Sequence, residues 1–194
     1  MNQMHLTNFW TVGTSQKVYD PILDYTTFVS EGQRDLFQQV LCCTSTDDPK
    51  KNAGNPTDLA ILKYMLSCNV DAVNIREKFP SEFMEPFTSD RKRVSTLLPV
   101  GKDGKKTFIL NGASELITKS CDKMLDLKTG QTVPIDAEWI KKMDQAIVGY
   151  AKQSLRTIGL SYKYVDKIDP EKKGDKGVLA DEESGFTLVG IAGI

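Results

Sequence analysis

One short stretch of the chain places an aromatic ring close to several cations. Phe87 is followed within six residues by Arg91, Lys92 and Arg93. A nucleotide base can stack on the flat face of an aromatic ring, and a nearby lysine or arginine can neutralise phosphate. A solvated turn explains the same residues more economically. On residue types alone this stretch therefore stays a candidate for nucleotide contact, with the turn as the alternative.

Two further segments allow a similar pair of interpretations. In 111–115, Gly112 and Ala113 carry so little side chain that a flat ligand could approach the backbone. The alternative is a helix start, capped by Asn111 or Ser114 with an acid in the first turn. Arg156 opens a later extended segment, where it offers a cation to a ligand or is an ordinary surface arginine.

Other chemistries are disfavoured by the residue inventory. The 194 residues include 25 Lys and Arg, 26 Asp and Glu, and one histidine, so the net charge is −1. This balance argues against a nucleic-acid binder, and a single histidine leaves little basis for a histidine-dependent triad or zinc site. The segment 101–107 superficially resembles a phosphate loop. Two residues separate its glycines, where a phosphate loop has four, and a strand follows, so we interpret it as a hairpin turn.

The elements that must position these residues follow from apolar periodicity. Asn55 can cap a helix that has Pro56 in its first position and Asp58 in its first turn. Helices are also predicted over 33–43, 113–125 and 136–152, and strands over 6–12, 94–100, 106–110, 155–164 and 186–194. Helices and a hairpin mix without strand–helix–strand alternation, which indicates an α+β fold.

The length indicates one domain spanning 1–194. Residues 166–185 are highly charged and contain three glycines, so we expect a mobile, exposed loop. The alternative is a protein-interaction segment.

Four motifs, taken together and in order, resemble one family. They are GNPTDLAIL at 54–62, PFTSDRKRVST at 86–96, NGASELITKSC at 111–121 and LRTIGLSYK at 155–163. Each is weak alone, but their order and spacing are similar to the nucleotide-binding domain of the P-type cation-transporting ATPases, with the plasma-membrane calcium pumps as the most similar subgroup. The first ten residues and the last nine also resemble segments that border this domain. The chain is thus expected to be a domain cut from a longer pump.

The resemblance implies a twisted, mainly antiparallel sheet flanked by helices, and a set of residues that bind ATP with Mg²⁺. Phe87 resembles the aromatic that stacks on adenine, and Asp58 stands where the family usually has a glutamate that binds the adenine amino group. Lys92 and Arg156 resemble cations at the phosphate end. The remaining matched positions are Ser89, as in the plasma-membrane subgroup, Asn111, which replaces the family's lysine, and Gly112 and Ala113, the small floor of the adenine pocket.

The resemblance also implies partners and a location. The domain would be a monomer on the cytoplasmic side of an integral membrane protein, working with the phosphorylation and actuator domains of the same pump and with no nucleic acid. The phosphorylation motif Asp-Lys-Thr-Gly-Thr does not occur in the sequence. We therefore expect ATP binding without turnover. The alternatives are a complete phosphotransferase or hydrolase, or a nucleotide-binding or interaction module with no role in transport.

Overall fold

The computed structural model describes residues 3–194, so Met1 and Asn2, the first two residues of the predicted domain, lie outside the described part. Nine strands in this part form one hydrogen-bonded sheet. They are β1 (Asn8–Thr11), β2 (Thr14–Lys17), β3 (Phe83–Glu85), β4 (Arg93–Leu98), β5 (Lys106–Ala113), β6 (Cys121–Leu125), β7 (Thr132–Pro134), β8 (Thr157–Val165) and β9 (Phe186–Gly193). The α-helices are α1 (Arg34–Cys42), α2 (Pro56–Ser67), α3 (Ala72–Lys78), α4 (Ser114–Ile117) and α5 (Ala137–Lys152), and short 3₁₀ segments cover Tyr25–Thr27, Glu31–Gln33, Thr118–Ser120, Asp175–Gly177 and Ala180–Glu182.

The strand order of the sheet is β2-β1-β9-β8-β5-β4-β3, and each neighbouring pair on this path is antiparallel. β6 joins β9 in parallel and forms an antiparallel pair with β7. The predicted α+β class with a mainly antiparallel sheet is therefore confirmed.

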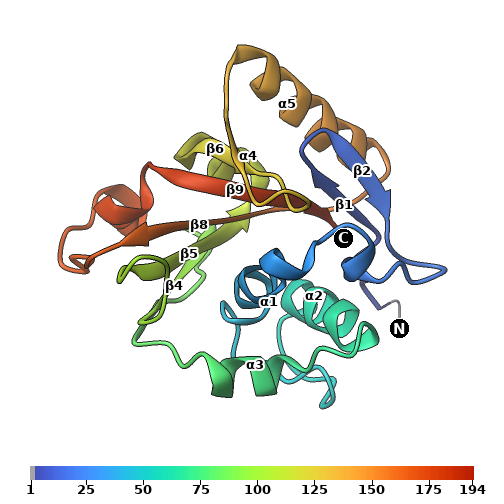
Figure 1. Cartoon of the computed structure of the whole chain (residues 1–194), viewed down its shortest axis with the longest axis horizontal. Helices are drawn as coiled ribbons and strands as arrows, with labels where there is room; N and C mark the ends of the chain where they lie inside the picture. Colours follow the sequence, from blue (N-terminus) through green and yellow to red (C-terminus); the bar gives the residue numbers. More distant parts are fainter. Residues whose placement is uncertain (1–2) are drawn as a thin grey trace.

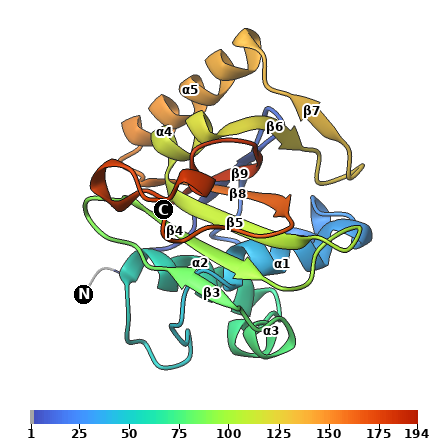
Figure 2. The same ribbon diagram turned by 90° about the vertical axis from the view of Figure 1, so that its left-hand side faces the viewer.

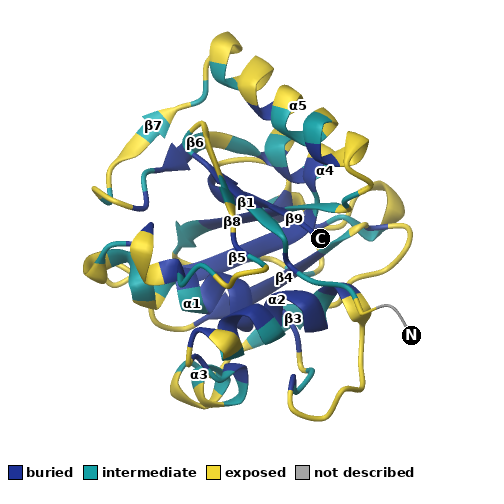
Figure 3. Ribbon diagram, turned by 90° about the vertical axis from the view of Figure 1, so that its right-hand side faces the viewer, coloured by how far each residue is buried: buried dark blue, intermediate teal, exposed yellow. Residues whose placement is uncertain are grey.

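Helices cover both faces of the sheet. α1, α2 and α3 lie on one side and α4 and α5 on the other (Figures 1 and 2). Alternation along β5 divides the core accordingly. Phe108 and Leu110 pack in the cluster that holds Ile117 of α4, whereas Ile109 packs in the cluster that holds residues of α1 and α2. The central strands are accordingly buried, and exposure is concentrated on loops and outer helix turns (Figure 3).

No helix in residues 3–194 combines the length and apolarity needed to cross a membrane.

Two local predictions rest on turn and cap chemistry, and both are confirmed. Asn55 caps α2 with its side-chain oxygen. The segment after β4 is a hairpin turn and not a phosphate loop, because Asp103 and Gly104 both have positive φ, 56° and 75°, and β5 then pairs with β4.

The helix predicted over 113–125 is wrong in its second half. α4 ends at Ile117, a 3₁₀ turn follows, and Cys121–Leu125 form β6. The apolar spacing suited a helix, but β6 pairs with the distant β9 as well as with the nearby β7, and local periodicity does not reveal the pairing with β9. In the charged segment 166–185 the side chains of Leu179 and Glu182 are fully buried. The mobility of this segment stays a prediction.

Candidate functional site

A pocket of about 390 Å³ opens where the end of β5 meets the start of α2. Antiparallel pairing sets the end of β5 beside the start of β8, with Gly112 opposite Gly159. The loop after α1 and the segment around β3 supply the remaining walls. We call this hollow the Phe87 pocket. It is lined by Thr44, Ser45, Thr46, Asp47, Asn55, Thr57, Asp58, Ile61, Met84, Pro86, Phe87, Val94, Asn111, Gly112, Arg156 and Ile158.

The first turn of α2 brings a carboxylate into the pocket. The side chain of Asn55 accepts hydrogen bonds from the backbone amides of Thr57 (2.9 Å) and Asp58 (3.2 Å), which fixes the turn. Burial, and then the charge of Asp47, raise the pKa of Asp58 to about 6, against a smaller lowering by a hydrogen bond to Ser45. The ionised Asp58 carboxylate is therefore poorly compensated within the protein, and a hydrogen-bond donor on a ligand could stabilise it.

Phe87 stands at the rim with 54% of its surface exposed. The turn that follows is closed by two hydrogen bonds: the amide of Lys92 donates to the carbonyl of Thr88 (2.8 Å), and the amide of Arg91 donates to the hydroxyl of Thr88 (3.0 Å). Ser89 and Lys92 are exposed on this turn and are not part of the pocket lining. The ring is therefore held on a structured turn with an accessible surface, which suits stacking on a flat ligand.

A buried ion pair holds the turn that carries Phe87. The guanidinium of Arg91 donates to both carboxylate oxygens of Glu182, Nη1 to Oε1 at 2.6 Å and Nη2 to Oε2 at 2.8 Å. The two side chains are 3% and 0% exposed. Arg91 Nε also donates to the carbonyl of Pro86 (3.1 Å), and Nη1 donates to that of Gly177 (2.9 Å). Bidentate pairing of this kind fixes orientation as well as distance, so Arg91 anchors the residue before Phe87 to the charged segment.

Asn111 is engaged within the fold. It is 5% exposed, and its side-chain nitrogen donates to the carbonyl of Val40 (2.8 Å) and the hydroxyl of Thr44 (3.1 Å). Its side-chain oxygen accepts from the amide of Ser161 (3.3 Å). These bonds tie β5 to the end of α1 and to β8. The alternative interpretation of Asn111 or Ser114 as a helix cap is wrong, because α4 has no side-chain cap bond.

Gly112 stands where two strands approach closely. A Cβ atom at this position would lie 2.3 Å from the carbonyl oxygen of Lys92 and 2.8 Å from the Cα atom of Arg93. Only glycine fits such an approach without displacing backbone. The amide of Ala113 donates to the same Lys92 carbonyl (3.0 Å), and Ala113 is not part of the pocket lining. The small residues here thus set the spacing of β4 against β5.

Arg156 brings a cation to the pocket lining beside the first turn of α2. Its side chain is exposed, and Nη1 donates to the hydroxyl of Thr57 (2.8 Å) in the first turn of α2. Its amide and carbonyl both bond to the backbone of Ile194 at 2.8 Å. The backbone is therefore fixed, while the guanidinium keeps donors available toward solvent.

The structure brings five of the eight predicted site residues into the pocket lining, namely Asp58, Phe87, Asn111, Gly112 and Arg156. Ser89, Lys92 and Ala113 lie outside it. Contact of each residue with a nucleotide stays a prediction. Sequence reasoning missed the wall formed by residues 44–47, although a polar loop running directly into a capped helix was a usable signal.

Comparison with known proteins identifies relatives over most of the chain. A family model described as P-type ATPase, cytoplasmic domain N, matches residues 33–194. Calcium-transporting ATPase 4, plasma membrane-type, of Arabidopsis thaliana is 33% identical over 170 residues, which are 84% of this chain and 16% of that protein. Calcium-transporting ATPase 2, plasma membrane-type, of the same plant is 35% identical over 73% of the chain and 13% of its own length. A calcium-transporting ATPase of Listeria monocytogenes is 30% identical over 84% of the chain and 18% of its own length. The chain thus spans roughly a sixth of the length of these curated relatives.

Proposed function

Because this chain belongs to the P-type ATPases, as their cytoplasmic domain N, we propose that it binds ATP in the Phe87 pocket. The observation that carries the proposal is the half-exposed ring of Phe87 at the rim of a pocket that also contains the Asp58 carboxylate. A volume of about 390 Å³ falls within the range of small-molecule sites. Stacking satisfies the faces of a base, and a carboxylate can accept a hydrogen bond from the adenine amino group.

The charges of the pocket support one orientation of the nucleotide. Asp47 and Asp58 are partly buried in the pocket lining, whereas Arg156, which also lines the pocket, is exposed. Phosphates would be repelled by the two carboxylates, whereas a neutral base would not. The base therefore enters first, and the phosphates point outward past Arg156. Gly112 contributes by letting β4 approach β5 closely at the floor.

The outward orientation suits delivery of the γ-phosphate. We propose that an aspartate in a phosphorylation domain outside this chain receives it, with the actuator domain as a further partner in the parent pump. Such transfer depends on positioning and on Mg²⁺ bound to the phosphates. The names of the relatives support calcium as the transported ion of the parent. In this scheme the chain acts as a monomeric binding module on the cytoplasmic side of the membrane.

The direct test is an ATP titration followed through backbone amide NMR signals. We expect the signals of Asp58, Phe87, Gly112 and Arg156 to shift together at millimolar concentrations, which correspond to about 4 kcal/mol of binding free energy. Adenosine should reproduce the shifts at Asp58 and Phe87, and tripolyphosphate should not. Shifts that tripolyphosphate alone reproduces would contradict the proposed orientation.

A second measurement separates binding from catalysis. Incubation of the chain with Mg-ATP should release no phosphate above background, because the family's phosphorylation motif does not occur in this sequence. Turnover that stays with the protein through repurification would favour a complete phosphotransferase or hydrolase instead.

A further inference from the structure

A larger hollow, of about 630 Å³, lies at the other end of the β5–β8 pair. β5 and β8 run antiparallel, so the start of β5 and the end of β8 meet far from the Phe87 pocket. The hairpin before β5, the strand β6 and the start of α1 complete the walls. We call this hollow the lysine cleft, after the four lysines in its lining, which are Lys102, Lys105, Lys123 and Lys163.

The cleft carries an excess of positive charge. Asp103 is the single acidic residue in its lining, against the four lysines. Neither Lys102 nor Lys105 forms an ion pair with any residue in 3–194, and the partner of Lys123 is the exposed Asp122 at 3.0 Å. Exposed pairs of that kind contribute little and leave the cation available. Lys102, Lys105 and Lys123 are therefore cations that the rest of the protein does not neutralise, and an anion could bind to them.

Lys163 is the most buried of the four. Its ammonium donates to the carbonyls of Asp181 and Ser184 and lies 4.5 Å from the centre of the Phe186 ring. Burial lowers its pKa, against a raising influence of Asp181 and Glu182. Its ammonium is thus already bound by groups outside the lining of the cleft, and Lys163 borders the cleft with its side-chain stem.

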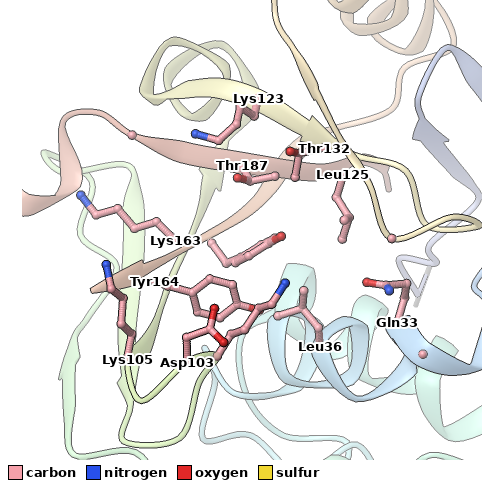
Figure 4. A pocket seen from close by; sticks show the side chains of 15 residues that line it. Gln33, Leu36, Asp103, Lys105, Lys123, Leu125, Thr132, Lys163, Tyr164 and Thr187 are labelled. Atoms are coloured by element: carbon pink, nitrogen blue, oxygen red, sulfur yellow. The ribbon is translucent and has the colours of Figure 1, made fainter. Parts of the chain in front are cut away.

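The opposite wall is uncharged. In Figure 4, Lys105, Lys123 and Lys163 lie at one side of the cleft, Gln33, Leu36 and Leu125 lie at the other, and the ring of Tyr164 is between them. Tyr164 packs edge-on against Tyr162, with ring centroids 5.3 Å apart, so its orientation is fixed. One side therefore suits an anionic group and the other a ring or an aliphatic part.

We propose that the lysine cleft binds a small organic phosphate, with its phosphate at Lys102, Lys105 and Lys123 and its carbon skeleton against Tyr164 and Leu36. The volume is in the range for small ligands, and aromatic contact beside cations favours a compact amphiphilic anion over an extended acidic peptide. The contribution of the 101–105 turn comes from the lysine side chains and not from a phosphate-binding backbone loop. The cleft and the Phe87 pocket share no lining residue, so this proposal can be tested independently of the ATP proposal.

The probes are phenyl phosphate and inorganic phosphate, titrated separately into the whole chain and followed by amide NMR. We expect signals at residues 102–105, 123 and 163 to shift, with no change at Asp58 or Phe87. Phenyl phosphate should bind at least threefold more tightly than inorganic phosphate because of the ring contact. Equal affinities, or shifts spread over the whole surface, would overturn the proposal. So would a hexaglutamate peptide that shifts the same signals at lower concentration than phenyl phosphate.

A charge-matched pair of variants sharpens the test. Lys102→Gln with Lys105→Gln should weaken phenyl phosphate binding about fivefold to tenfold, since exposed charge interactions each contribute up to about 1 kcal/mol. The control, Lys119→Gln with Lys141→Gln, removes the same charge from exposed positions outside both pockets. It should change the affinity less than twofold. Equal weakening in both variants would show a general electrostatic effect of the lost charges and would overturn the assigned site.

Discussion

The two hollows at opposite ends of the β5–β8 pair differ in charge although they share the same two strands. The Phe87 pocket contains two aspartates and one exposed arginine, and the lysine cleft contains four lysines and one aspartate. The first suits the uncharged part of a ligand and the second suits an anion. The two ends of one strand pair can therefore suit different ligands, because most of the residues that set the charge, among them Asp58, Lys102 and Lys105, lie outside β5 and β8.

One segment contacts both regions. The carbonyls of Asp181 and Ser184 accept from Lys163 at the cleft, and Glu182 pairs with Arg91 behind Phe87. Substitutions in this segment and in the wall of each hollow test whether the two regions act separately.

The largest effect is expected from Glu182→Ala. It leaves the guanidinium of Arg91 buried without its carboxylate, so we expect a loss of about 3–5 kcal/mol in the free energy of unfolding. The measurement is urea unfolding. The adjacent Glu183→Ala is the control, because Glu183 is exposed and should change stability by less than about 0.5 kcal/mol. Similar small losses in both variants would show that the pair contributes little. Phenyl phosphate binding is then measured on the folded Glu182→Ala variant. A changed affinity at the cleft would show that the two regions are coupled.

Phe87→Ala should weaken ATP binding about tenfold, within the range of about 1–3 kcal/mol for loss of one stacking platform. Stability should change little, because the ring is 54% exposed. Isothermal titration calorimetry gives the affinity, and Phe87→Trp, which keeps an aromatic face, should retain it. An alanine variant that binds ATP like the original would contradict the assignment of the pocket, whereas weakened phenyl phosphate binding would contradict the independence of the cleft.

Arg156→Gln should lower the affinity for ATP about threefold and leave that for adenosine unchanged, because an exposed cation acts on phosphates at modest strength. The matched control is Lys152→Gln, an exposed cation at the end of α5 outside both pockets. Equal losses with ATP and adenosine would mean that Arg156 acts through Thr57 and the shape of the pocket.

The last prediction concerns the pH dependence of stability. The pKa of Asp58 is raised from 3.8 to about 6, so the fold favours the protonated carboxyl. That stabilisation is complete below about pH 4 and is lost as the pH rises through 6. Asp58→Asn should therefore gain stability relative to the original chain between pH 4 and 7, as measured by urea unfolding at each pH. If the difference in unfolding free energy between Asp58→Asn and the original chain stays constant from pH 4 to 7, the raised pKa of Asp58 is contradicted.

Much of the fold was predictable from local signals. The cap at Asn55 and the turn at Asp103–Gly104 were readable because a few adjacent residues determine each of them. β6 was not, because its parallel partner β9 lies about 65 residues later in the chain. Within the site, Phe87 was predicted from its place beside cations and from motif resemblance, and Asp58 from the resemblance. The full engagement of Asn111 within the fold was hidden, because its partners lie about 50 to 70 residues away in α1 and β8.

The buried pair of Arg91 and Glu182 also has a consequence for local opening. Exposed, charged segments usually exchange their amide hydrogens quickly, because they open without the rest of the protein. Here a bidentate pair joins residues 91 positions apart, and opening either segment would expose an unpaired charge in a desolvated place. Residues 86–91 and 177–182 are thereby joined into one cooperative unit, and their slow amide hydrogens should exchange together at a common rate.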